Sequence, residues 1–256
     1  MGFVTINGRS VPIKGAKTVL EIARREGIWI PTLCNHPGLP PYGACRLCLV
    51  EVKAGAKPGL AASCTLPATD GLVVETDTPR VQRTRKILIK LLLERAPEAE
   101  VVKDLAKKLG VVPPAEQVAA PETTRCILCG LCVRACESIG SSAIGFAFRG
   151  SRRKVMPPFG KPALECLGCQ ACVQVCPTGE VVFTISGNRL QGEPWRSEVE
   201  LKECASCGRL FAPRPLVEHL KERFGFDFAG EELCPECRRQ AMAAKLAETI
   251  LPGAQG

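Results

Sequence analysis

Sixteen cysteines fall into four sets of four, and no cysteine is left over. Thiolates are soft ligands that select iron–sulfur clusters, zinc or Cu(I). The sets are Cys34, Cys45, Cys48 and Cys64; Cys126, Cys129, Cys132 and Cys136; Cys166, Cys169, Cys172 and Cys176; and Cys204, Cys207, Cys234 and Cys237. Each set has the spacing of a metal site, so the fold must assemble four thiolate centres. Three have the spacing of iron–sulfur sites and the last that of a zinc site.

A disulfide framework is the alternative explanation of so many cysteines. Such frameworks are typical of short secreted chains, whereas this chain has 256 residues and opens at Met1–Ile6 without the basic and apolar regions of a signal peptide. No apolar run approaches the about 18 residues of a membrane span. We therefore expect a cytoplasmic protein with reduced cysteines and no transmembrane segment.

The formal net charge of +8 is a feature shared with nucleic-acid-binding proteins. Four thiolates around a +2 core, however, leave about −2 at each site, or about −8 over four sites. The excess Lys and Arg then offsets the charge of the metal sites. No recognition helix or aromatic-interleaved basic stretch is visible, so we expect no nucleic-acid partner.

Residues 1–77 form the first predicted domain. Short apolar runs on either side of Asn7-Gly8 predict a β-hairpin. The motif Thr18-Val19-Leu20-Glu21 is a capping box that opens a helix, and residues 49–52 and 72–75 are predicted strands. The sequence thus predicts a small α+β domain, and by analogy its order of elements is that of a β-grasp ferredoxin.

Residues 78–121 are predicted to form a helical connector and a linker. Thr78-Pro79 caps a first helix with proline at its first position. The inner face of this helix is expected to carry Val81, Leu88, Leu91 and Leu92. Pro97 is expected to open a second helix that ends at Gly110, and residues 111–121 are a Pro/Ala-rich linker.

Residues 122–190 contain the internal repeat of the chain, two copies of Cys-x2-Cys-x2-Cys-x3-Cys. This is the bacterial ferredoxin run, in which the fourth cysteine of each copy ligates the cluster of the other copy. We therefore assign one [4Fe–4S] cluster to Cys126, Cys129, Cys132 and Cys176, and the other to Cys166, Cys169, Cys172 and Cys136. Two zinc sites are the alternative, but structural zinc usually uses paired knuckles.

The first cysteine set departs from the plant-type Cys-x4-Cys-x2-Cys spacing, because ten residues separate Cys34 from Cys45. The segments Ile30–Cys34 and Gly43–Cys48 resemble the N-terminal [2Fe–2S] domain of the large iron–sulfur subunit of respiratory NADH dehydrogenase. NAD-linked hydrogenases, iron-only hydrogenases and NAD-linked formate dehydrogenases share this domain. The resemblance implies that Cys34, Cys45, Cys48 and Cys64 bind [2Fe–2S]. Zinc is the alternative, which the long first gap disfavours.

The resemblance extends over residues 1–190, with one departure. Many relatives carry a further cluster, held by one histidine and three cysteines, between the [2Fe–2S] and dicluster parts. This sequence has no Cys or His between Cys64 and Cys126, so that cluster is expected to be absent. The sequence also has no hydrogenase active-site domain and no molybdopterin domain. It resembles a detached, non-catalytic electron-relay subunit.

Residues 199–256 hold the last set, in two Cys-x2-Cys knuckles and a predicted closing helix. A closed four-cysteine shell is typical of structural zinc, so we expect a zinc-ribbon-like block. Mononuclear iron of the rubredoxin type is the alternative. A rubredoxin would be expected to have glycine after the second knuckle, where this chain has Arg238-Arg239.

The expected function is electron transfer by one [2Fe–2S] and two [4Fe–4S] clusters beside one Zn²⁺. No G-x-G-x-x-G after a strand and no P-loop is visible, so a partner flavoprotein must handle NAD(P)H. The other partner is expected to be a hydrogenase, a formate dehydrogenase, a heterodisulfide-reductase-like module or a soluble ferredoxin. The alternatives are a free-standing polyferredoxin and, in another class, a non-redox zinc-binding regulatory protein.

Overall fold

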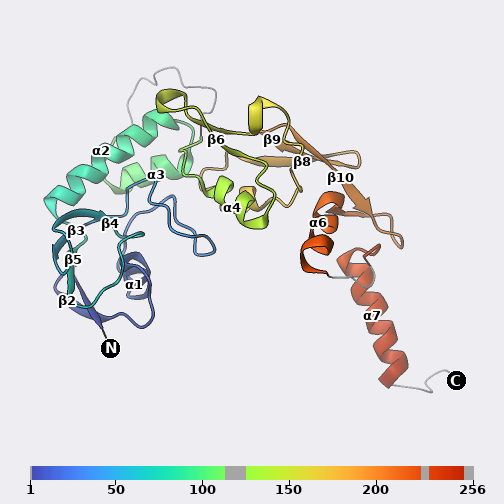
Figure 1. Ribbon diagram of the computed structural model, residues 1–256, viewed down its shortest axis with the longest axis horizontal. Coiled ribbons are helices and arrows are strands. Elements are labelled where there is room, and N and C mark those ends of the chain that lie inside the picture. The colour runs from blue at the N-terminus through green and yellow to red at the C-terminus, as the bar shows by residue number, and fades with distance from the viewer. Residues whose placement is uncertain (1, 113–124, 226–230, 251–256) are drawn as a thin grey trace. The chain divides into compact units, whose positions relative to one another are not determined.

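The computed structural model describes residues 2–112, 125–225 and 231–250, and Figure 1 traces its helices and strands. The composition is mixed α+β, as the sequence predicts. The predicted linker of residues 111–121 lies outside the described residues from position 113 onward. Within the described part, no helix is both long enough and apolar enough to span a membrane.

The chain divides into two units that each combine separate segments of sequence. The first comprises Met1–Ala135 and Val175–Glu180, and the second comprises Cys136–Gln174 and Val181–Gly256. Two of the boundaries fall near the last cysteine of a ferredoxin run. One lies directly before Cys136, and the other lies between Gln174 and Val175, one residue further from Cys176. Each unit therefore contains three cysteines of one run and the fourth cysteine of the other.

The first unit is built on a five-stranded sheet of order β2-β1-β5-β3-β4. Its strands are β1 (Phe3–Ile6), β2 (Arg9–Pro12), β3 (Leu49–Ala54), β4 (Gly59–Ala62) and β5 (Leu72–Glu75). Strands β1 and β5 are parallel, and the other neighbours are antiparallel. The predicted hairpin is confirmed, with Asn7 and Gly8 at φ 51° and 77°, the left-handed pair that a type I′ turn requires.

Helix α1 (Val19–Arg25) packs its apolar side into the core of this sheet. Its capping box is confirmed, because the Thr18 hydroxyl accepts a 3.3 Å hydrogen bond from the Glu21 amide. The Glu21 carboxylate in turn accepts one of 2.8 Å from the Lys17 amide. The cap satisfies amide groups that have no partner within the helix.

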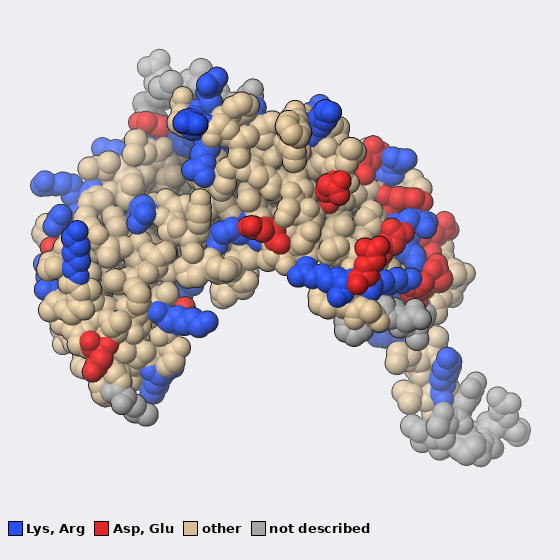
Figure 2. Space-filling model, viewed as in Figure 1, with Lys and Arg blue, Asp and Glu red and all other residues tan. Residues whose placement is uncertain are grey.

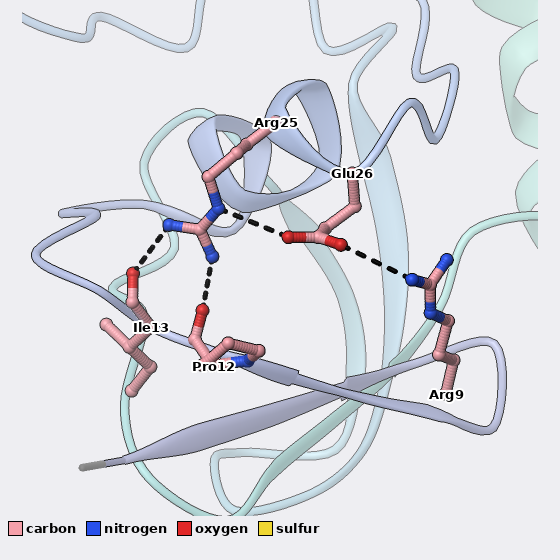
Figure 3. A network of polar contacts seen from close by, with 5 residues as sticks. All are labelled: Arg9, Pro12, Ile13, Arg25 and Glu26. Atoms are coloured by element: carbon pink, nitrogen blue, oxygen red, sulfur yellow. Dashed lines mark hydrogen bonds and ion pairs between the residues drawn. The ribbon is translucent and has the colours of Figure 1, made fainter.

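The C-terminal end of α1 is tied to the first hairpin by a small polar network (Figure 3). The Arg25 guanidinium donates to the carbonyls of Ile13, at 2.9 Å, and of Pro12. It also pairs with Glu26 at 3.2 Å, and Glu26 pairs with Arg9 at 3.5 Å. These exposed ion pairs each contribute little alone, but together they fix the helix over β2.

Helices α2 (Pro79–Arg95) and α3 (Glu100–Lys108) follow the sheet. The Thr78 cap is confirmed by its 3.2 Å hydrogen bond from the Val81 amide. Pro97 does not open the second helix, which begins three residues later. The ring of Pro97 disfavours a helical conformation at the residue before it, and Ala96 accordingly lies at φ −136° and ψ 66°. Pro97 and Glu98 lie in a turn closed by a 3.1 Å hydrogen bond from the Ala99 amide to the Ala96 carbonyl, and α3 starts after this turn.

The inner face of α2 differs from the one expected. Its buried residues are Val81, Arg85, Ile89 and Leu93, which repeat every four residues. Leu88 and Leu92 are only partly buried, and Leu91 is 55% exposed. Val81 is buried as expected, but the prediction was wrong for Leu91, because the periodicity of apolar residues gave no sign that the buried row includes a charged residue with partners of its own.

A second apolar core of the first unit joins α2 and α3 to the cysteine loops. Its buried members are Leu33, Cys34, Cys45, Leu47, Ile89, Leu93, Ala96, Ala99, Val102, Leu105, Ala106, Val111, Ile127, Cys129 and Leu131. Cysteines from the first set and from the first ferredoxin run thus share one core. The connector helices supply the apolar surface between the two loops.

The second unit contains a four-stranded antiparallel sheet of order β11-β10-β9-β8. Its strands are β8 (Val182–Ser186), β9 (Arg189–Glu193), β10 (Ser197–Glu203) and β11 (Leu210–Pro213). A smaller hairpin pairs β6 (Gly145–Ala147) with β7 (Lys154–Met156), and short 3-10 turns η1 (Gly150–Arg152) and η2 (Pro158–Gly160) flank β7. Helices α6 (Arg214–Phe224) and α7 (Pro235–Ile250) complete the unit.

Charged side chains of both signs are scattered over the face in Figure 2, most of which is formed by other residues. Lys and Arg side chains are spread over this face, and most Asp and Glu side chains gather over the four-stranded sheet. The positive charge of the chain does not form a single large patch in this view. That the protein has no nucleic-acid partner stays a prediction.

Candidate metal centres

The first cysteine set lies in loops of the five-stranded sheet. Three of its cysteines lie in the irregular segment between α1 and β3, and Cys64 lies after β4. Cys48 immediately precedes β3 and Cys64 follows β4. The antiparallel pairing of these two strands brings Cys48 and Cys64 together, and the Ser63 amide donates to the Cys48 carbonyl at 3.0 Å. The Cys34 sulfur accepts a 3.4 Å hydrogen bond from the Cys45 amide. All four cysteines are buried.

The thiols of this set perturb one another strongly. The pKa of Cys34 is lowered to about 6, mainly by a hydrogen bond from the Cys45 thiol and despite the opposing effect of burial. The pKa of Cys48 is lowered to about 6 in the same way by Cys64. The donor thiols, Cys45 and Cys64, have raised pKa values. The hydrogen bonds from Cys45 and Cys64 therefore favour the thiolate forms of Cys34 and Cys48, and thiolate is the form that binds metals.

The two ferredoxin runs adopt the same local conformation. In the first run Leu128 and Gly130 have φ 53° and 72°, and in the second Gly168 and Gln170 have φ 67° and 57°. These positions lie two and four residues after the first cysteine of each run. The left-handed residues turn the backbone twice within five residues, which lets successive cysteines face one centre. The sequence repeat is therefore also a repeat of backbone geometry.

A short helix follows each loop and carries the later cysteines. Helix α4 (Leu131–Ile139) holds Cys132 and Cys136, and α5 (Ala171–Val175) holds Cys172, with Cys176 directly after it. The first unit contains Cys126, Cys129, Cys132 and Cys176, and the second contains Cys136, Cys166, Cys169 and Cys172. Each fourth cysteine thus falls in the unit of the other run.

The electrostatics of the thiols follow the same grouping. Burial is the main cause that raises the pKa of Cys126, of Cys129 (to about 12) and of Cys132, and the charge of Cys176 raises all three further. Burial likewise raises the pKa of Cys169 and, to about 12, of Cys172, with a contribution from Cys136. The four sulfurs of each crossed set therefore lie within electrostatic range of one another. Neutral buried thiols of this kind require a strong cation to ionise.

The last set is the most compact. Cys204, Cys207, Cys234 and Cys237 have all four sulfurs within 4.8 Å of one another. The sulfurs of Cys207 and Cys234 are 3.8 Å apart, which equals the edge of a tetrahedron with metal–sulfur bonds of about 2.3 Å. The Cys204 sulfur accepts a 3.2 Å hydrogen bond from the Cys234 amide, the main reason that its pKa is lowered to about 6. A single tetrahedral ion fits this site.

Three charged residues near these centres were not anticipated from the sequence. Arg85 is buried and donates from Nε to the Leu47 carbonyl at 3.0 Å and from Nη2 to the Leu49 carbonyl at 2.7 Å. Burial lowers its pKa. The two carbonyls flank Cys48, so Arg85 braces the first centre. Its place four residues after Val81, on the buried row of α2, is the one sequence signal for this role.

The second of these residues is Arg134, which lies between Cys132 and Cys136 on α4. It donates to the Cys34 carbonyl at 3.0 Å and to the Pro40 carbonyl, and its guanidinium lies 5.3 Å from the centre of the Tyr42 ring. The third is Glu180, whose pKa is raised by burial and whose charge acts on Cys126. No sequence signal marks either residue, because both act on loops distant in the chain.

Two family models match this chain. A "2Fe-2S iron-sulfur cluster binding domain" covers residues 3–79, and a "4Fe-4S dicluster domain" covers residues 119–183. The crystal structure of an NAD+-reducing [NiFe]-hydrogenase in the H2-reduced state superimposes with a TM-score of 0.55 at 31% identity, over 61% of this chain and 75% of that one. The chain belongs to the iron–sulfur subunit family of NADH dehydrogenases and NAD-reducing hydrogenases. This subunit family is the one that the cysteine motifs indicate.

Other relatives align with most of this chain at about one third identity. An NADH-quinone oxidoreductase subunit of Rhizobium meliloti is 32% identical over 80% of this chain, and the NADPH-Fe(3+) oxidoreductase subunit alpha of Geobacter sulfurreducens is 30% identical over 80%. NADP-reducing hydrogenase subunit HndD of Solidesulfovibrio fructosivorans is 30% identical over 70%. The matches span only 26%, 26% and 35% of these longer relatives. The chain therefore corresponds to part of each of these relatives.

Proposed function

We propose that the chain relays single electrons between a flavoprotein that handles NAD(P)H and a second redox module. The second module would be a hydrogenase, a formate dehydrogenase, a heterodisulfide-reductase-like protein or a soluble ferredoxin. The observation that carries this proposal is the shared apolar core in which Cys34 and Cys45 of the first set are buried together with Cys129 of the first ferredoxin run. Two redox centres in one buried apolar core are well arranged to exchange electrons.

The route would start or end at a [2Fe–2S] cluster held by Cys34, Cys45, Cys48 and Cys64. The next carrier would be a [4Fe–4S] cluster on Cys126, Cys129, Cys132 and Cys176. The charge of Cys34 contributes to the raised pKa of Cys129, which supports this order because charge effects fall with distance. The third carrier would be a [4Fe–4S] cluster on Cys166, Cys169, Cys172 and Cys136. The crossed ligand sets are supported by the grouping of the thiol charges described above.

The protein's own residues would orient these carriers and set their surroundings. Arg85 and Arg134 donate to carbonyls beside Cys48 and at Cys34. Their positive charge favours the reduced cluster, which carries one more electron. Hydrogen bonds and charge near the sulfurs are the levers by which a protein tunes cluster potentials. Zinc at Cys204, Cys207, Cys234 and Cys237 has no redox activity, so this site would be structural.

Reduction by different donors tests the relay. NAD(P)H delivers two electrons at once and each cluster accepts one, so a flavin must stand between them. The anaerobically purified chain should be bleached by dithionite but not by NADH or NADPH. Adding the flavoprotein that co-purifies from the native host should restore bleaching by one nucleotide. We expect the relay itself to operate in the cytoplasm. Rapid bleaching of the flavin-free chain by NADH would contradict a pure relay.

A further inference from the structure

The first knuckle of the four-cysteine site is the turn of a β-hairpin. Strand β10 ends at Glu203 and β11 begins at Leu210, with Cys204 and Cys207 between them. The Cys204 amide donates to the Arg209 carbonyl at 2.9 Å, and the Gly208 amide donates to the Cys204 carbonyl at 2.9 Å. A metal ion in this knuckle would therefore fix one end of the hairpin directly.

The other end of the same hairpin packs on a cluster loop. Gly168 lies between Cys166 and Cys169 and has φ +67°. A Cβ at this position would lie 2.6 Å from Val199 Cγ2, on β10, and 3.0 Å from Pro213 Cβ, at the end of β11. Real Cβ atoms essentially never approach other atoms to 2.6 Å, so the hairpin leaves room only for glycine. The cluster loop and the hairpin are in direct contact.

Helix α6, which follows β11 without a break, reaches a second ligand-bearing element. His219 Nε2 is hydrogen-bonded to the Ile139 carbonyl at 3.0 Å, and Arg223 donates to the same carbonyl. Ile139 is the last residue of α4, one turn after Cys136. Carbonyls at a helix C-terminus lack partners within the helix, and α6 supplies the partners here. The helix end that carries Cys136 is therefore capped by the four-cysteine block.

A third contact joins these two elements to each other. The Ser141 hydroxyl, just after α4, donates to the Glu165 carbonyl at 2.6 Å. Glu165 immediately precedes Cys166. The segments that carry Cys136 and Cys166 are thus hydrogen-bonded to each other. Helix α6 contacts the first of these segments, and the β10–β11 hairpin contacts the second.

Among the described residues, the hairpin has a small apolar core with which to hold this position. The buried cluster of the four-stranded sheet consists of Leu190, Val199 and Leu201, with Phe183 and Leu210 partly buried against it. Small blocks with so few buried apolar residues usually depend on a metal or disulfides for stability. A structural zinc ion contributes its binding energy to folding. The rigidity of the hairpin would therefore depend on the metal in the knuckle.

We propose that the zinc-binding β10–β11 hairpin and α6 form a clamp on the second [4Fe–4S] centre, the one assigned to Cys166, Cys169, Cys172 and Cys136. This inference rests on the cluster assignment in the proposed function. Occupancy of the zinc knuckle positions the Gly168 loop and the Cys136 helix end, so the metal site and the second cluster are coupled. The [2Fe–2S] centre and the first [4Fe–4S] centre lie in the other unit and are outside this coupling.

A pair of glycine substitutions tests the contact. Gly168→Ala and its matched control Gly179→Ala carry the same backbone strain, with φ +67° and +66°, but nothing lies within 4 Å of a Cβ at Gly179. In the full-length holoprotein, Gly168→Ala should lose or alter the EPR signal of the second [4Fe–4S] cluster and lower iron from about ten to about six atoms per chain. Gly179→Ala should keep all three signals. Equal spectra and iron content for both variants would overturn the proposal.

Removal of the metal tests the coupling itself. Cys207 is the exposed ligand of the set, and Cys207→Ser should release zinc and weaken the second cluster, while the [2Fe–2S] signal persists and reports that the first unit is folded. If Cys207→Ser does not fold, a chelator that strips zinc from the wild-type holoprotein gives the same comparison. Zinc loss with all iron retained and an unchanged second signal would refute the clamp. Absence of the cluster signals from the wild-type protein would instead refute the proposed function.

Discussion

Replacement of Arg85 should destabilise the first metal centre selectively. Arg85→Met keeps most of the apolar stem and removes a guanidinium that donates to the Leu47 and Leu49 carbonyls at 3.0 and 2.7 Å. A buried carbonyl left without a partner costs about 1–3 kcal/mol. Leaving both carbonyls without partners destabilises this segment, and removing a buried charge offsets part of that cost. The expected net loss of local stability is about 2–4 kcal/mol. The exposed Arg83 on the same helix is the matched control, and Arg83→Met should stay within about 0.5 kcal/mol.

Hydrogen–deuterium exchange of the anaerobic holoprotein measures this loss locally. If the β3 segment opens reversibly, a loss of about 2–4 kcal/mol accelerates its exchange about 30- to 700-fold, since about 1.4 kcal/mol is a factor of ten. The peptide around Cys48 should respond, while peptides of the four-stranded sheet should not. Equal exchange rates in Arg85→Met and Arg83→Met would refute the view that Arg85 braces this centre.

Two further predictions concern the first [4Fe–4S] centre. Cys176→Ser should alter the EPR signal of the cluster on Cys126, Cys129 and Cys132, because the fourth ligand crosses between runs. The other [4Fe–4S] signal should stay in place. The opposite pattern would show that each run holds its own cluster. Glu180→Gln should raise the reduction potential of the same cluster, because a half-buried carboxylate opposes the added electron. The shift should be on the order of tens of millivolts, since tenfold in a one-electron equilibrium is about 59 mV, and an unchanged potentiometric titration would exclude this effect.

The elements that local chemistry encodes could be predicted from the sequence. The Asn7-Gly8 turn and the Thr18 and Thr78 caps depend on residues that are neighbours in the chain, and all three are confirmed. The cysteine spacing of the repeat likewise predicts the dicluster domain, and the resemblance of the first cysteine segments predicts the [2Fe–2S] domain; the family models match both. The assignment of each cysteine to a particular cluster stays a prediction, supported by the charges of the thiols.

The features that depend on long-range packing could not be predicted. Periodicity placed Leu91 on the inner face of α2, but it is 55% exposed, because the buried row of the helix is set by the loop carbonyls that Arg85 contacts. The contact of Gly168 with Val199 and Pro213 joins residues 31 and 45 positions apart. A glycine in a ferredoxin loop gives no sign of which surface packs against it, so only the fold reveals the contact.

The most direct test of the electron-relay account is a combined metal analysis and EPR redox titration of the chain purified without oxygen. The account predicts about ten iron atoms and about one zinc per chain, from one [2Fe–2S] cluster, two [4Fe–4S] clusters and one four-cysteine site. Stepwise reduction should then reveal three separate one-electron signals. About four zinc atoms per chain, with iron near zero and no EPR signal on reduction, would contradict the account.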